Sequence, residues 1–86
     1  MKQLKQLIIA VTATDIAHGK RNDCTLCPIA LSLRRRYPGK KIWVDYEVVR
    51  IGRRTVDVTG RVEAWMFAFD AGKSVRPTSF VLDAAA

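Results

Sequence analysis

KIWVDYEVVRIGRRTVDV, residues 41–58, is the stretch of sequence that indicates the fold. Lys41–Val49 alternates apolar and polar residues, which predicts one strand because successive side chains of a strand point to opposite faces. One face would carry Ile42, Val44, Tyr46 and Val48, and the other face Trp43, Asp45, Glu47 and Val49. Gly52 lies among arginines and indicates a hairpin turn. The return strand would be Thr55–Val58, with Val56 and Val58 pointing inward.

The segments on either side of this hairpin predict further strands and the helices. They are a strand over Lys5–Thr12, a helical turn over Thr14–Gly19, a helix from Pro28 to Tyr37, a helix over about Arg61–Ala71 and a strand over Thr78–Leu82. This order of elements is typical of an α+β two-layer sandwich. We expect βαββαβ, ferredoxin-like order, with two helices on one face of a four-stranded antiparallel sheet. The strand order within that sheet stays open.

Apolar side chains at helical and strand spacing define the expected core. It consists of Leu7, Ile9, Val11, Ile29, Leu33, Val44, Tyr46, Val56, Val62, Trp65, Met66, Phe69 and Phe80. Ser32, Arg34 and Arg35 fall outside the buried stripe of their helix. Two aromatic residues, Trp43 and Phe67, have no core position in this scheme. They are candidate contacts for a partner protein if exposed, or core residues if a loop or a broader helix face covers them.

Length and composition indicate a single folded domain over residues 1–86, with a frayed tail at 83–86. The chain is 49% hydrophobic and 27% charged, which excludes a disordered linker. The longest apolar run, Leu7–Val11, is far shorter than the roughly 20 residues that span a bilayer, so no membrane partner is expected. The first residues lack the long apolar run of a signal peptide. We therefore expect a cytoplasmic protein.

The net charge of +7 is placed unevenly along the chain. Nine basic and two acidic side chains precede Ile42, and six of each follow it. A surface of one sign attracts anions, so this half predicts an anionic partner, either a nucleic acid or nucleotide or an acidic protein surface. The candidate binding residues are Arg34, Arg35, Arg36, Lys40 and Lys41, with Lys20 and Arg21. Solubility and the helix dipole are alternative reasons for these charges.

Cys24 and Cys27 form a C-x-x-C pair that invites a redox or metal interpretation. His18 is the only histidine, so a zinc site would need Asp15 or Asp23 as a weak fourth ligand. We predict no metal and no cofactor. Cys27 precedes Pro28 and therefore lies at the helix N-cap, where the dipole would lower its thiol pKa. We nevertheless predict that Cys27 is a small buried residue under the helix start without a catalytic role.

Several functional classes lack their required residues. An RNA-recognition domain carries aromatic residues on its third strand, and Ile51–Val58 has none. A zinc deaminase needs a ligand histidine followed two residues later by glutamate, but His18 is followed by Gly19 and Lys20. No glycine-rich phosphate loop is present. We therefore predict that the protein is not an enzyme.

Three segments, Asp15–Gly19 (DIAHG), Cys27–Leu33 (CPIALSL) and Phe69–Phe80 (FDAGKSVRPTSF), resemble a known group of sequences. They are similar to small uncharacterised proteins encoded by bacteriophages and prophages. These proteins share a Cys-Pro-[Ile/Val]-Ala-Leu helix start and a Phe-Asp-x-Gly-x-x-Val-x-Pro-x-x-Phe close. The resemblance implies a phage accessory protein of the host-cell cytoplasm and carries over no activity.

Three hypotheses about function follow from these features. The first is non-catalytic binding of a nucleic acid or nucleotide through the basic half of the chain. The second is a phage inhibitor, for anti-defence or host takeover, that docks Trp43 or Phe67 on a host protein. The third is a small redox or metal protein that uses His18, Cys24 and Cys27. The oligomeric state is not predicted.

Overall fold

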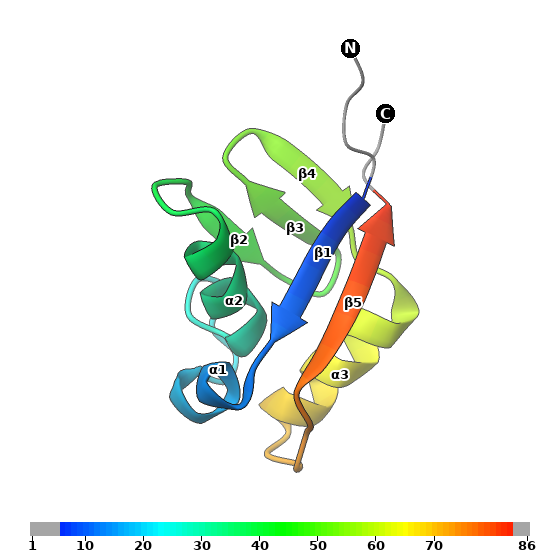
Figure 1. Cartoon of the computed structure of the whole chain (residues 1–86). Helices are drawn as coiled ribbons and strands as arrows, with labels where there is room; N and C mark the ends of the chain where they lie inside the picture. Colours follow the sequence, from blue (N-terminus) through cyan, green and yellow to red (C-terminus); the bar gives the residue numbers. More distant parts are fainter. Residues whose placement is uncertain (1–5, 84–86) are drawn as a thin grey trace.

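The computed structural model describes residues 6–83 and contains helices and strands in nearly equal measure (Figure 1). The elements are β1 (Gln6–Val11), α1 (Ala13–His18), α2 (Pro28–Arg36), β2 (Ile42–Val44), β3 (Val48–Ile51), β4 (Arg54–Asp57), α3 (Gly60–Asp70) and β5 (Thr78–Asp83). Asp83 ends β5, whereas the rest of the predicted frayed tail, 84–86, lies outside the described residues. Within 6–83, no helix has the length and apolar character that crossing a membrane requires.

The strands form two antiparallel sheets. β1 pairs with β5, and β2, β3 and β4 form a meander in that order. In Figure 1 the β1–β5 pair lies in front of the meander, with α2 on one side and α3 on the other. α2 packs against β1 and β2, and α3 contacts β5 where Trp65 meets Phe80 edge-on. The core lies between these layers.

The α+β class and the antiparallel pairing are confirmed, but the single four-stranded sheet of ferredoxin-like order is not. Lys41–Val49 is two strands rather than one. The Asp45 Oδ1 atom accepts hydrogen bonds of 2.8 Å from the backbone N–H groups of both Glu47 and Val48, and Asp45 N–H donates to the Val48 carbonyl at 3.0 Å. An aspartate side chain bonded in this way stabilises a turn in place of a strand ladder.

This turn changes which side chains of the meander face the core. Before the turn, Ile42 and Val44 are buried as predicted. After it, Val49 and Ile51 are buried and Val48 is only half-buried, the reverse of the predicted alternation. The next turn is where it was predicted: Gly52 links β3 to β4 with a φ of 59°, a left-handed conformation that favours glycine.

Eleven of the thirteen predicted core residues are buried, and Tyr46 and Trp65 are partly buried against the core. The core also takes in Cys27, Ala30, Ile42, Val49, Ile51 and Leu82. Ser32, predicted to point away, is buried, and its hydroxyl donates to the Ile29 carbonyl at 2.7 Å. The reason is that α1 packs against α2 and widens the buried face of that helix.

α1 begins earlier than predicted, with Thr12 rather than Thr14 as its N-cap. The Thr12 hydroxyl oxygen accepts from Asp15 N–H at 3.1 Å, and the Asp15 carboxylate accepts from Thr12 N–H at 2.9 Å. This reciprocal capping box satisfies two of the free N–H groups at the helix start. It also fixes the Asp15 carboxylate in a buried position close to α2.

Neighbouring isoleucines in β1 test the assignment of faces. Ile9 is 0% exposed and Ile8 is 42% exposed. Ile9→Ala should lower the free energy of unfolding by about 2–5 kcal/mol because it leaves a cavity. Ile8→Ala should cost less than about 1 kcal/mol, which is the range of strand propensity alone. Urea denaturation followed by circular dichroism measures both, and equal losses would contradict the assignment.

Candidate functional site

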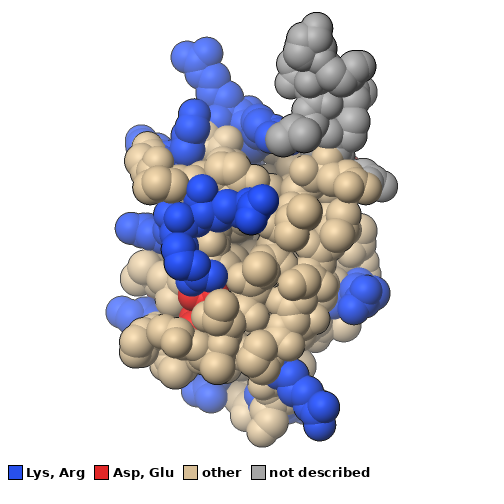
Figure 2. Space-filling model, viewed as in Figure 1, with Lys and Arg blue, Asp and Glu red and all other residues tan. Residues whose placement is uncertain are grey.

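Four cationic side chains line one groove, which we call the basic groove. It has a volume of about 780 Å³ and is lined by Arg34, Lys40, Lys41, Trp43 and Arg50, together with Thr25, Pro38, Gly39, Ile42 and Gly52. No aspartate or glutamate is among its lining residues. Figure 2 shows Lys and Arg side chains gathered on this side of the molecule, over the end of α2 and the neighbouring meander.

Turn geometry and strand register bring these cations together. α2 ends before the Pro38–Gly39 turn, where Gly39 has a φ of 85°, and the chain returns with Lys40 and Lys41 beside the helix end that carries Arg34. Lys41 and Trp43 are two residues apart, so they share the outward side. Arg50 is the direct partner of Trp43 in the β2–β3 pairing. The groove therefore combines one helix end, one loop and two strands.

The structure divides the predicted basic patch. Arg34, Lys40 and Lys41 line the groove, whereas Lys20, Arg21, Arg35 and Arg36 do not. The Arg36 guanidinium lies 5.9 Å from the ring centre of Tyr37. The Arg21 guanidinium lies 5.8 Å from the Phe69 ring centre, and its Nε donates to the Phe69 carbonyl at 3.2 Å. These residues lie apart from the groove because they belong to other faces of the fold.

Arg35 is engaged by the buried Asp15 carboxylate. Its two terminal nitrogens lie 2.6 and 3.1 Å from the two carboxylate oxygens, and one of them also reaches the Ala10 carbonyl at 3.3 Å. Burial of Asp15 would raise its pKa, but the hydrogen bonds from Arg35 and Thr12 outweigh burial, so the pKa lies below its ordinary value. Arg35, predicted as part of an anion site, is thus already paired with a carboxylate and does not line the basic groove.

Arg50 and Thr25 are groove residues that the sequence analysis missed. Arg50 belongs to the half of the chain whose charges balance, so composition alone does not single it out. The β2–β3 register would have placed Arg50 opposite Trp43. That register was not predicted, because Lys41–Val49 was predicted as one strand without a turn. Thr25 reaches the groove from the loop before α2, a juxtaposition that no local pattern indicates.

Trp43 and Phe67 are both exposed, 41% and 51% respectively. The Trp43 indole N–H donates to Asp45 Oδ2 at 2.8 Å. Burial opposes ionisation of Asp45, but this bond, the backbone bonds of the turn and the nearby Arg50 charge lower its pKa. Phe67 stacks on Tyr46 at 4.2 Å between ring centres, so one of its faces is covered. Only Trp43 lies in the basic groove.

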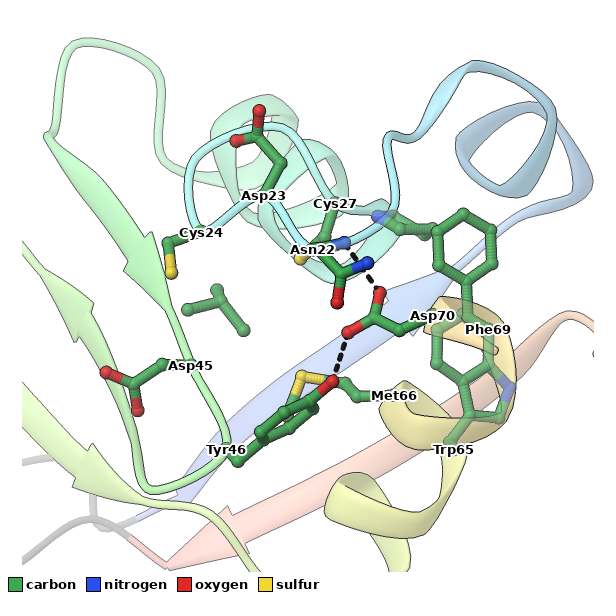
Figure 3. Close-up of a pocket in the computed structure, with 12 residues that line it drawn as sticks. Asn22, Asp23, Cys24, Cys27, Asp45, Tyr46, Trp65, Met66, Phe69 and Asp70 are labelled. Atoms are coloured by element: carbon green, nitrogen blue, oxygen red, sulfur yellow. Dashed lines mark hydrogen bonds between the residues drawn. The ribbon is translucent and has the colours of Figure 1, made fainter. Parts of the chain in front are cut away.

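A second cavity, of about 230 Å³, contains both cysteines, and we call it the cysteine pocket (Figure 3). Its walls come from the loop before α2, the β2–β3 turn and the end of α3. Asp70 joins these segments, because its carboxylate accepts from Asn22 N–H at 2.9 Å and from the Tyr46 hydroxyl. The bond to Asp70 raises the pKa of Tyr46 to about 12. Asp23, Asp45 and Asp70 line this pocket, and no lysine or arginine does.

The two thiols are free, and neither is activated. Cys27 is the N-cap of α2, where its Sγ atom accepts from Ala30 N–H at 3.4 Å. The predicted lowering of its pKa is wrong: burial raises it to about 11, and this effect exceeds that of the N–H groups at the helix start. Burial and three aspartates also raise the pKa of Cys24.

Thiols with raised pKa values are poor nucleophiles at neutral pH. His18 is exposed at the end of α1, and Asp23 accepts from Thr25 and Leu26 to hold its own loop. Among the residues that the structure describes, no three His, Cys, Asp or Glu side chains gather where they could hold a metal ion. Asp23, Cys24 and Cys27 line one pocket, but the residues weighed as zinc ligands do not form a cluster that could hold a metal ion.

Comparison with protein-family models, curated proteins and solved structures finds no match to this chain.

The Asp15–Arg35 pair predicts a pH dependence of stability. Because folding lowers the pKa of Asp15, the stabilisation is present above the ordinary value of 3.8 and is lost as pH falls through the folded-state pKa. Asp15→Asn should lower the free energy of unfolding by about 1 kcal/mol at neutral pH, since Arg35 is half exposed. Denaturation from pH 7 downward should show this difference disappearing below about pH 4. Asp57→Asn, an exposed control, should show no such pattern.

The two cysteines should differ in reactivity towards a disulfide reagent. Cys27 is buried and its pKa is about 11, so at pH 8 only about one thiol in a thousand is ionised. The Cys24→Ser variant, which keeps Cys27, should therefore react at least about tenfold more slowly than Cys27→Ser, which keeps the half-buried Cys24. Absorbance of the released thiolate follows both rates. In denaturant the two variants should react at equal rates, which serves as the reference. Equal rates in the folded protein as well would contradict the conclusion that Cys27 is the more protected thiol.

Proposed function

We propose that this protein binds a polyanion of the nucleic-acid or nucleotide class in the basic groove and catalyses no reaction on it. The observation that supports this most is the concentration of Arg34, Lys40, Lys41 and Arg50 around one groove without an acidic lining residue. Within residues 6–83 the only ion pair joins Arg35 to Asp15; Asp45 lies near enough to Arg50 for that charge to lower its pKa but forms no ion pair with it. A polyanion would supply the missing counter-charges.

Structural roles account for other arginines but not for Lys40, Lys41 and Arg50. Arg35 fixes α1 to α2 through Asp15, and Arg36 lies over Tyr37. Both, like Arg34, also lie in the last turn of α2, where positive charge complements the helix dipole. Lys40, Lys41 and Arg50 lie outside any helix and make no such contribution. Cations spread over the whole surface would keep the protein equally soluble. The four groove cations instead line one concave site, so solubility does not explain their position.

A second candidate function is docking on a host protein, and the exposure of Phe67 outside the groove favours it. Tyr46 supports one face of Phe67, and its other side is available as a rigid aromatic contact. The phage origin implied by the sequence resemblance fits either function. The two differ in salt sensitivity, because release of counterions accompanies phosphate binding but not docking of an aromatic ring.

Replacing all four groove cations with alanine tests the proposal. The variant Arg34→Ala, Lys40→Ala, Lys41→Ala, Arg50→Ala should bind a fluorescein-labelled oligonucleotide at least about tenfold more weakly at low salt. The slope of log affinity against log salt should shrink by about 0.7 for each phosphate that the variant no longer neutralises. Fluorescence anisotropy measures the affinity, and circular dichroism checks that the variant folds.

The matched control replaces Lys20, Arg54, Lys73 and Arg76, four exposed cations that do not line the groove. Both variants lose the same net charge, so a difference between them reports the site rather than the overall potential. Wild-type affinity in the groove variant, or equal weakening in both variants, would overturn the proposal. The host-protein candidate would then become the better one.

A further inference from the structure

Trp43 lies on the outward face of the meander, in the middle of the edge strand β2. The strand pairings place Trp43 of β2 opposite Arg50 of β3, and Arg50 opposite Thr55 of β4. All three side chains are exposed, whereas the residues before and after Trp43 are buried. The indole is therefore the large apolar member of a row whose other members are a cation and a hydroxyl.

Core packing does not account for this tryptophan. The second tryptophan, Trp65, is half-buried, stacks near Phe69, meets Phe80 edge-on and donates its indole N–H to the Arg76 carbonyl. Trp43 has no aromatic partner among the described residues and remains 41% exposed. Its single hydrogen-bond donor is already held by Asp45. What the ring still offers a ligand is its apolar face rather than a hydrogen bond.

Cations lie on two sides of this face. Lys41 is two residues earlier on the same side of β2, roughly 7 Å away along the strand. Arg50 lies directly across the strand pair, and Arg34 and Lys40 complete the groove. A ligand that uses the whole groove needs a flat unsaturated ring with anionic groups on both sides of it. A nucleotide within a strand has this composition, with one base between two phosphates.

We infer that the groove binds single-stranded nucleic acid, with one base stacked on Trp43 and the flanking phosphates on Lys41 and Arg50. This inference rests on the proposed function and narrows it. In a duplex, the base faces are covered by neighbouring base pairs and cannot stack on a side chain unless the helix opens. Polyphosphate has no base to stack. Stacking on an aromatic side chain tolerates any base, so little sequence preference is expected.

Three polyanionic probes test the inference: a labelled oligothymidylate of about 12 nucleotides, a duplex of similar length and inorganic polyphosphate. The duplex carries about twice the charge of the single strand, so charge alone would favour the duplex. The wild-type protein should bind the single strand most tightly and lose Trp43 fluorescence as the base stacks. Trp43→Ala should weaken binding to the single strand by about tenfold and leave binding to polyphosphate unchanged. Trp43→Phe, which keeps a ring, should retain most of the affinity.

Phe67→Ala is the matched control because Phe67 is also exposed but lies outside the groove, and it should bind as the wild type does. The inference fails alone if Trp43→Ala binds the single strand normally while the four-cation variant does not. It also fails alone if duplex or polyphosphate binds best. If wild type and the four-cation variant bind all three probes equally weakly, both the inference and the proposed function are wrong.

Discussion

The Asp45 carboxylate accepts hydrogen bonds from three N–H groups, and the shape of the meander depends on them. One oxygen binds the backbone of Glu47 and Val48, which reverses the chain. The other oxygen binds the indole of Trp43. The reversal sets the register in which Trp43 faces Arg50, and the indole bond orients the ring on that face. The ionised Asp45 side chain thus shapes both the sheet and the groove. Its hydrogen bonds from N–H donors lower its pKa and so keep the carboxylate ionised.

The basic groove and the cysteine pocket have opposite charge. Arg34, Lys40, Lys41 and Arg50 line the basic groove, and Asp23, Asp45 and Asp70 line the cysteine pocket. A polyanion would be attracted to the basic groove and repelled from the cysteine pocket, which would favour its binding on the side of Trp43. The pocket also keeps its thiols protonated, because burial raises the pKa of both cysteines and the nearby carboxylates add to this effect at Cys24. The charge pattern therefore favours binding in the groove over thiol chemistry in the pocket.

Local signals in the sequence predicted most elements and most of the core. Pro28 marks the start of α2, Gly52 makes the β3–β4 turn, and the apolar spacing of β1 and α3 predicts which side chains are buried. These features depend on neighbours in the chain, so a single sequence contains them. The turn at Asp45 was missed because an aspartate between apolar residues fits the polar face of a strand as well as a turn. Only the pairing of Ile42 with Ile51 favours the turn.

For the candidate site, the sequence by itself determined which charged and aromatic residues are present: a basic first half, three consecutive arginines at a helix end and a tryptophan at an outward strand position. Tertiary structure alone decided which of these groups act together. Consecutive residues on a helix are rotated by about 100°, so Arg34 lines the groove while Arg35 reaches a carboxylate 20 residues away in the chain. Arg50 joined the groove through strand register, and burial rather than the helix dipole set the pKa of Cys27. Register, ion pairing and desolvation depend on which distant segments meet, and local sequence patterns do not contain that information.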